Sequence, residues 1–241
     1  GIVMHTDSAQ AVGKIPVRVD DLGVDLLSVA GHKLYAPKGI GALYVRGGIR
    51  LEKLVHGADH EMNWRAGTEN VLEIVGLGEA CRLVHEELES HGAQLARLRD
   101  RLEGGLQQRY PDLRCNGHRQ KRLPNTASVS FRGLEANTIL SELAGVAASA
   151  GAACHSDHVD VSAVLTAMDV PLEFAMGTVR FSVGRFTTEA EIDRALDEIG
   201  AVVDRLRPSA ACPVADTTDD IKLTRFTHGL GHGVGLETHE A

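Results

Sequence analysis

The segment from Ser28 to Gly41 reads SVAGHKLYAPKGIG and contains the lysine with the most distinctive surroundings in the sequence. Lys33 lies between two apolar runs and is followed by a Pro-Lys-Gly turn, which is unusual for a solvated surface charge. A lysine in a dry pocket can lose its proton and attack an aldehyde, as enzymes that work through a Schiff base require. On these residues alone, an ordinary lysine at a strand edge is the alternative.

Two other side chains could act on a small ligand. Cys154 lies in the stretch ASAGAACHS, whose small residues predict a flexible or tightly turned loop from which a sulfur could approach a ligand. Arg180 lies in GTVRFSVG, and a planar guanidinium is suited to clamp a carboxylate. A structural cysteine and a surface ion pair are the respective alternatives.

The elements expected to position Lys33 are those of an α/β protein. Apolar runs at 2–6, 24–29 and 41–45 predict short strands separated by Gly-rich turns. A helical pattern then extends from about 71 to 110. Its face is marked by five leucines at helical spacing, namely Leu88, Leu95, Leu98, Leu102 and Leu106.

The elements expected around Arg180 are two strands and two helices. Residues 125–131 predict a half-buried strand and 136–143 a helix. In 177–184 the alternation places one set of side chains, Val179, Phe181 and Val183, opposite another, Thr178, Arg180 and Ser182. Thr188 and Glu191 have the spacing of a capping box, which predicts an amphipathic helix that ends before Pro208.

The segment around Lys33 resembles the cofactor-lysine motif of class V aminotransferase-like enzymes, especially cysteine desulfurases of the NifS/IscS type. The similarity extends almost without gaps from residue 1 to about 207. It implies an α/β fold, that of the fold-type I transferases that depend on pyridoxal 5'-phosphate (PLP). Residues 1–87 would be the C-terminal part of the large PLP-binding domain, and 88–207 the smaller α+β domain with the cysteine loop. Residues 208–241 would be a linker and an unrelated tail.

The resemblance assigns the residues that would hold the cofactor ring. Lys33 would carry PLP, with His32 beside it. Asp7 matches the aspartate that pairs with the pyridinium nitrogen, and Gln10 matches the glutamine that hydrogen-bonds the phenolate oxygen. A carboxylate in that place keeps the ring protonated, so that the ring can accept electrons. An aspartate that caps a turn at a strand end is the alternative for Asp7.

The phosphate site departs from the family pattern at one position. Many relatives have a serine three residues before the lysine, and here that residue is Ala30. Phosphate binding is therefore expected to depend more on His32. Thr68 matches a threonine that reaches the phosphate of the neighbouring subunit, which implies a homodimer with shared sites. A plain Gly-Thr turn is the alternative.

The resemblance also implies the reaction. Cys154 matches the active-site cysteine, His155 beside it is expected to be a solvated loop residue, and Arg180 matches the arginine that binds the substrate carboxylate. The activity implied is removal of sulfur from L-cysteine, which leaves L-alanine and an enzyme persulfide. That sulfur would pass to an acceptor or scaffold protein, as in iron-sulfur cluster supply. A selenocysteine lyase on the same scaffold, acting on L-selenocysteine, is the alternative.

Composition excludes several other classes. The net charge is -8 with both signs mixed along the chain, which argues against a surface for nucleic acid or anionic membranes. No apolar run approaches the roughly 18 residues of a membrane helix. The four cysteines are widely spaced without a CxxC pair, so we expect neither a zinc site nor a disulfide framework. Cysteines of this kind are typical of a reducing compartment, and we therefore expect a cytoplasmic location.

The two ends of the chain have unusual sequences. Gly1 leads directly into an apolar stretch, which is typical of the middle of a protein. We therefore expect the phosphate-cradling first half of the family domain to be missing and the fragment to be incomplete as an isolated catalyst. Residues 220–231 resemble the start of selenophosphate synthetase, and 226–241 the metal-site segment of M24 peptidases. We interpret this tail as a join of two unrelated coding pieces and assign no metal to it. An M24 metallopeptidase fragment and a non-catalytic remnant that dimerises or docks partners are the remaining alternatives.

Overall fold

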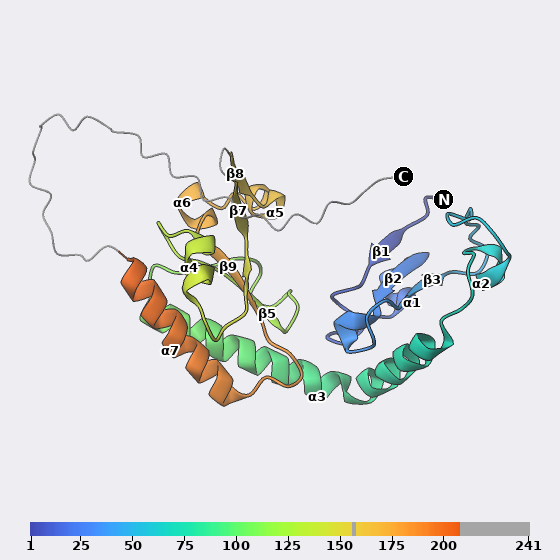
Figure 1. The fold of residues 1–241 in the computed structure, drawn as a ribbon, viewed down its shortest axis with the longest axis horizontal. Helices are drawn as coiled ribbons and strands as arrows, with labels where there is room; N and C mark the ends of the chain where they lie inside the picture. Colours follow the sequence, from blue (N-terminus) through green and yellow to red (C-terminus); the bar gives the residue numbers. More distant parts are fainter. Residues whose placement is uncertain (156–157, 208–241) are drawn as a thin grey trace, which may run out of the picture. The chain divides into compact units, whose positions relative to one another are not determined.

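The computed structural model describes residues 1–155 and 158–207 (Figure 1). For residues 152–155 and 158–160 it describes the backbone alone. The linker and tail lie outside the described residues, and so do the resemblances to selenophosphate synthetase and to M24 peptidases.

A three-stranded sheet positions the lysine. Its order is β1 (His5–Asp7), β2 (Leu26–Ala30) and β3 (Gly41–Val45), with β1 parallel and β3 antiparallel to β2. All three predicted strands are present, although the first is shorter than expected. Two short helices connect them, α1 (Val19–Leu22) and the 3-10 helix η1 (Gly31–Leu34), and α2 (His60–Asn63) follows β3.

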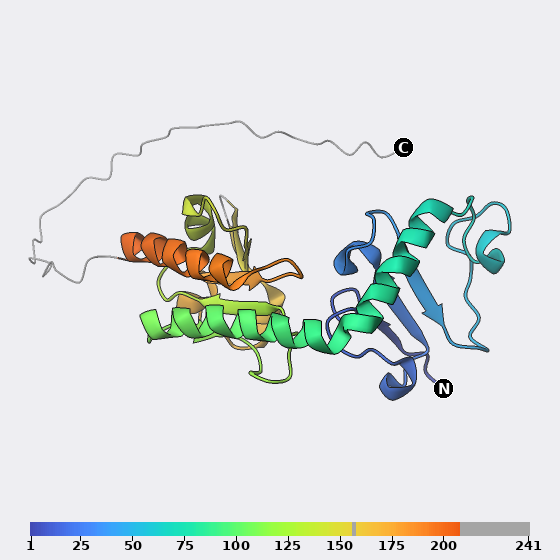
Figure 2. The same cartoon turned by 90° about the horizontal axis from the view of Figure 1, so that it is seen from below.

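The long predicted helix is α3 (Val71–Arg109), whose first turn is capped by the Asn70 side chain. It contacts η1 at one part of its length and α7 (Glu189–Leu206) and β5 (Thr126–Ser130) at another (Figure 2). Four leucines of the predicted face are buried, namely Leu95, Leu98, Leu102 and Leu106, and the fifth, Leu88, is half-buried. The proposed domain boundary at 87/88 lies inside this continuous helix, and the boundary itself stays a prediction.

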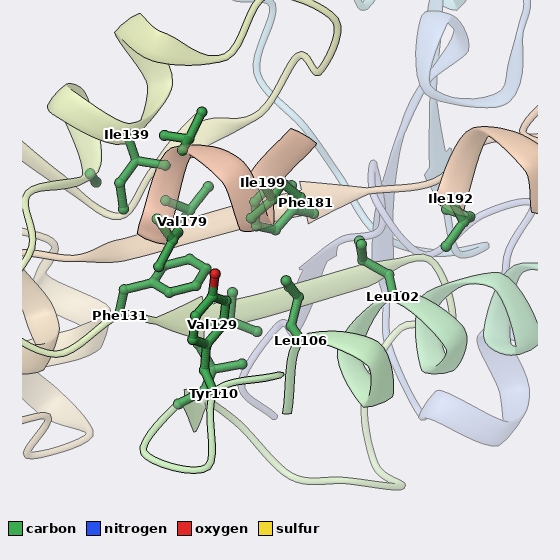
Figure 3. Close-up of a cluster of buried hydrophobic side chains, with 14 of the residues drawn as sticks. Leu102, Leu106, Tyr110, Val129, Phe131, Ile139, Val179, Phe181, Ile192 and Ile199 are labelled. Carbon is green, nitrogen blue, oxygen red and sulfur yellow. The ribbon is translucent and has the colours of Figure 1, made fainter. Parts of the chain in front are cut away.

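A four-stranded antiparallel sheet carries Arg180. Its order is β4 (Arg114–Cys115), β5, β9 (Thr178–Ser182) and β6 (Ser149–Ala150). One face packs on α3 and α7 around a core whose labelled members include Val129, Phe131, Val179 and Phe181 (Figure 3). The predicted alternation in β9 is confirmed except at its first residue. Thr178 is buried, and its hydroxyl is satisfied there by a hydrogen bond with Ser130 Oγ at 2.7 Å and by another to the Phe174 carbonyl at 3.1 Å.

Helices complete this second part of the fold. The capping box at Thr188 and Glu191 is present, and α7 begins there as predicted. The predicted helix at 136–143 is α4 (Ala136–Glu142). The sequence did not reveal α5 (Ala163–Ala167) or α6 (Leu172–Ala175), which are each about one turn long. Within the described ranges, no helix is both long and apolar enough to cross a membrane.

The prediction of a loop at Cys154 was wrong. Cys154 lies in β7 (Ala152–His155), which pairs antiparallel with β8 (His158–Val161) and places Cys154 opposite Val159. His155 is therefore also a strand residue. The sequence that follows, His-Val-Asp-Val, alternates β-branched with polar residues, a pattern that favours a strand and can recruit the neighbouring segment into a hairpin.

Candidate active site

A cavity of about 700 Å³ brings together four of the residues predicted to bind cofactor or substrate. Gln10, His32 and Lys33 line it from the first sheet and its connections, and Arg180 lines it from β9. These residues are far apart in the sequence, so the fold itself gathers them. The volume is within the range of cavities that hold small ligands and cofactors.

The lysine is presented by the short helix η1. Gly31 donates its backbone N–H to the Ile40 carbonyl at 3.0 Å, and any Cβ at Gly31 would lie 2.8 Å from that oxygen, so only glycine fits this close approach. The tight turn buries Leu34 and leaves His32 and Lys33 exposed. The dry pocket expected for the lysine is thus not formed by the described residues.

Arg180 projects from the polar side of β9, as the alternation predicts. It is exposed, and its Nη2 donates to Ser149 Oγ at 3.3 Å. Among the described residues, no carboxylate lies within ion-pair distance of its guanidinium. In this part of the chain nothing supports the alternative of a surface ion pair, and the guanidinium can bind an anion.

Two predicted site residues, Asp7 and Thr68, do not line the cavity. Asp7 is exposed at the end of β1, where its Oδ1 accepts a hydrogen bond from Ala9 N at 2.9 Å. This is the turn-capping arrangement that the sequence left open for Asp7. Thr68 is exposed and does not line the cavity. The side chain of Cys154 lies outside what the structure describes.

The sequence did not single out two titratable side chains of the cavity, those of Lys14 and His91. Lys14 lines it and donates from Nζ to the Lys33 carbonyl at 3.3 Å. Burial, followed by the charge of Lys33, lowers the pKa of Lys14. Burial, followed by the charge of Arg185, lowers the pKa of His91, which also lines the wall. Neither residue has a spacing that would mark it in the sequence.

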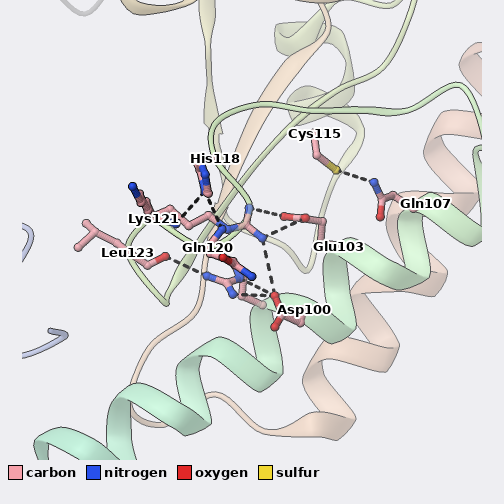
Figure 4. A network of polar contacts seen from close by, with 10 residues as sticks. Asp100, Glu103, Gln107, Cys115, His118, Gln120, Lys121 and Leu123 are labelled. Atoms are coloured by element: carbon pink, nitrogen blue, oxygen red, sulfur yellow. Dashed lines mark hydrogen bonds and ion pairs between the residues drawn. The ribbon is translucent and has the colours of Figure 1, made fainter.

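A buried ion-pair network fixes one wall of the cavity, the loop 116–125 (Figure 4). Arg122 donates two hydrogen bonds to the Glu103 carboxylate, at 2.7 and 3.0 Å, and these bonds hold its pKa above the ordinary value. Arg99 donates to the Leu123 carbonyl at 3.0 Å. His118 Nδ1 accepts from two backbone N–H groups of the same loop. Arg122 is therefore held charged at the wall.

The cavity is strongly cationic. Lys14, Lys33, Arg122 and Arg180 all line it, and none of the described residues lining it is Asp or Glu. Such a lining favours a ligand with phosphate or carboxylate groups. The primary amine of Lys33 and the amide of Gln10 supply the groups that a carbonyl and a phenolate oxygen would need. The donor set therefore fits PLP together with an amino acid. Within the described residues, no cluster of His, Cys, Asp or Glu could hold a metal ion.

The chain is similar to proteins named cysteine desulfurase. One from Gluconacetobacter diazotrophicus is 47% identical over 209 residues, which are 86% of this chain and 52% of that protein. Cysteine desulfurase NifS from Azotobacter vinelandii is 45% identical over the same share of each chain. This chain thus spans about half the length of the relatives that it matches.

Two solved structures with the same fold carry NifS-like names. One NifS-like protein superposes with a TM-score of 0.76 at 33% identity, over 85% of this chain and 53% of that one. A NifS-like protein from Rickettsia africae gives a TM-score of 0.75 at 28% identity, over 83% and 53%. These neighbours confirm the predicted fold-type I architecture. The family model for aminotransferase class-V matches residues 1–195, and the chain therefore belongs to that family.

Proposed function

We propose that this protein takes part in a PLP-dependent cysteine desulfurase reaction, in which L-cysteine gives L-alanine and a persulfide on Cys154. The observation that carries the proposal is the cavity that joins Lys33 to Arg180, lined by four cationic side chains without a carboxylate among its described residues. An α-amino acid and a phosphorylated cofactor both suit such a lining. The names of the relatives point to the same reaction.

In this proposal the cofactor is held by residues of both the sheet and its turns. Lys33 would bind the aldehyde carbon, Gln10 the phenolate oxygen, and Asp7 the pyridine nitrogen through the carboxylate oxygen that does not accept from Ala9. His32 and Thr68 bind the phosphate, with Thr68 reaching a second subunit in a homodimer. When bound, PLP supplies an electrophilic aldehyde and a ring that takes up negative charge.

The remaining steps belong to side chains of this chain. Arg180 binds the α-carboxylate of L-cysteine and so orients the α-carbon toward Lys33. The Lys33 amine moves the proton at that carbon. The Cys154 thiolate forms an S–S bond to the substrate sulfur as the bond from that sulfur to the β-carbon breaks. The β-carbon keeps the electron pair of that bond and gains a proton, which gives the methyl group of alanine. An acceptor or scaffold protein in the cytoplasm then takes the sulfur.

The alternative substrate, L-selenocysteine, would use the same residues. A C–Se bond is weaker than a C–S bond, so its cleavage depends less on an attacking thiolate. Alanine release from each substrate therefore separates the two activities, and a preference for selenocysteine would favour the lyase.

The direct test of the site uses the full-length protein that contains this segment, called the parent protein from here on. Its variant Arg180→Gln is compared with Arg132→Gln as the matched control. Arg132 is also an exposed arginine, but it pairs with Glu173 and does not line the cavity. Because Arg180 would lose a charge-assisted carboxylate clamp, we expect kcat/KM for L-cysteine to fall roughly hundredfold. The control variant should match the parent protein. Equal activity of both variants would refute the role of Arg180, and absence of alanine release by the parent protein would refute the reaction.

A further inference from the structure

Tyr35 connects the turn that presents Lys33 to the segment that follows β9. Its hydroxyl oxygen accepts a hydrogen bond from the backbone N–H of Arg185 at 2.7 Å. Its ring meets that of Phe186 edge to face, with the ring centroids 5.9 Å apart and the planes inclined by 71°. The Arg185 guanidinium lies 5.7 Å from the centroid of the Tyr35 ring. The Tyr35 side chain, two residues beyond Lys33, therefore makes three contacts with the segment that follows β9, the strand of Arg180.

The backbone at both ends of this contact is specialised. Tyr35 ends η1 with a φ of 69°, a left-handed conformation that residues other than glycine adopt rarely and keep only where surrounding contacts hold them. On the other side, a Cβ at Gly184 would lie 3.1 Å from the Tyr35 hydroxyl oxygen, so glycine leaves the room that this hydroxyl occupies. The glycine at 184 favours the bridge, whereas the left-handed conformation of Tyr35 follows from its place at the end of η1.

The segment after β9 is also held from a second element. The Arg185 side chain forms an ion pair with Glu87 of α3, while its backbone N–H is taken by Tyr35. The Arg185 side chain therefore fixes the segment to α3, and the Arg185 backbone N–H fixes it to the turn that presents Lys33. Removing the Tyr35 hydroxyl takes away its hydrogen bond to this segment but leaves the two ring contacts and the ion pair with Glu87.

We propose that Tyr35 is a positioning residue that sets the separation between Lys33 and Arg180. It would thereby match the site to substrates that carry an amine and a carboxylate on the same carbon. The proposal rests on the proposed function, because Lys33 must work at the α-carbon while Arg180 binds the carboxylate. Tyr35 also lines the cavity, but its hydroxyl is taken up by the Arg185 N–H, and we assign its effect to the position of β9.

The test compares Tyr35→Phe with Tyr44→Phe in the PLP-loaded protein. Tyr44 is a half-buried tyrosine of β3 whose hydroxyl makes no hydrogen bond among the described residues, so it controls for loss of a hydroxyl. Each protein is titrated spectroscopically with L-alanine, which has an amine and a carboxylate, and with ethylamine, which has the amine alone. The ratio of the two affinities measures how well the amine and carboxylate sites match.

We expect Tyr35→Phe to lower the preference for L-alanine over ethylamine by about three- to tenfold, the effect of losing one hydrogen bond. Ethylamine affinity should not change, and Tyr44→Phe should behave as the parent protein. A preference within about twofold of the parent value, or an equal loss for both ligands, would overturn the role of Tyr35. If the parent protein neither prefers L-alanine nor releases alanine from L-cysteine, the proposed function fails as well, so the two failures are distinguishable.

Discussion

The buried pair between Glu103 and Arg122 allows a quantitative prediction about the cavity wall. The two side chains are 9% and 14% exposed, and they share two hydrogen bonds. Glu103→Gln removes the negative charge but nearly keeps the side-chain volume. Arg122 then loses one charge-assisted bond, and its remaining charged partner is Asp100, which is 3.7 Å away and 60% exposed. Breaking a buried pair costs about 3–5 kcal/mol, and since glutamine still offers one acceptor, we expect a loss of about 2–4 kcal/mol in the free energy of unfolding.

The matched control is an exposed bidentate pair that also involves α3, between Arg101 and Asp193. Its two hydrogen bonds, 2.7 and 2.8 Å long, are as short, but the side chains are 45% and 50% exposed. Water screens such a pair, so Asp193→Asn should cost only about 0.2–1 kcal/mol. The measurement is urea unfolding followed by circular dichroism, with the slope of free energy against denaturant compared between variants.

A second variant tests the cause. In Glu103→Leu/Arg122→Met both charges are replaced by apolar groups, and no unpaired charge remains buried. This double variant should be more stable than Glu103→Leu alone. If Glu103→Gln and Asp193→Asn lose the same stability, or if the double variant is the less stable, then burial does not govern this network and the reasoning is wrong.

Three further predictions concern the lysine and the cysteines. Borohydride reduction should attach PLP to the parent protein at Lys33 and not to Lys33→Ala, as peptide mass spectrometry would show; attachment to another lysine would contradict the assignment. Cys154→Ala should nearly abolish alanine release from L-cysteine and leave more of the release from L-selenocysteine, since a C–Se bond needs the thiolate less; full activity on L-cysteine would refute the persulfide role. Burial, with a contribution from Glu103, raises the pKa of Cys115 to about 11. Its thiolate should therefore form only as the pH approaches that value, so alkylation of Cys115 should be slow near neutral pH, and fast modification there would show that the thiol is not buried.

The elements with strong periodicity could be predicted from the sequence. The leucine face of α3, the alternation of β9 and the capping box of α7 each depend on residues within one element, so their pattern is visible locally. The hairpin at Cys154 was missed, because its small residues favour a loop and the strand depends on pairing with Val159 and its neighbours. Pairing between segments is a tertiary effect that local composition does not carry.

The candidate site shows the same division between local and tertiary information. Lys33 and Arg180 lie in distinctive motifs, and the cavity brings them together. Lys14 and Arg122 stand in turns without a motif, and their place at the cavity wall follows from contacts with Lys33 and Glu103 that only the fold creates. The charge of the cavity, which decides what ligand it accepts, therefore comes partly from residues that no local pattern marks.

Tyr35 carries this argument one step further. In the sequence it is one aromatic residue in a turn, and nothing near it indicates a partner 150 positions away. The hydrogen bond to Arg185 exists because α3 and the second sheet bring the end of β9 to η1. A residue that determines the spacing of two binding groups in this way need not touch the ligand, so motif comparison alone would pass over it. Its effect should be visible only when the two groups are probed together, because a ligand that uses the lysine alone does not sense where Arg180 lies.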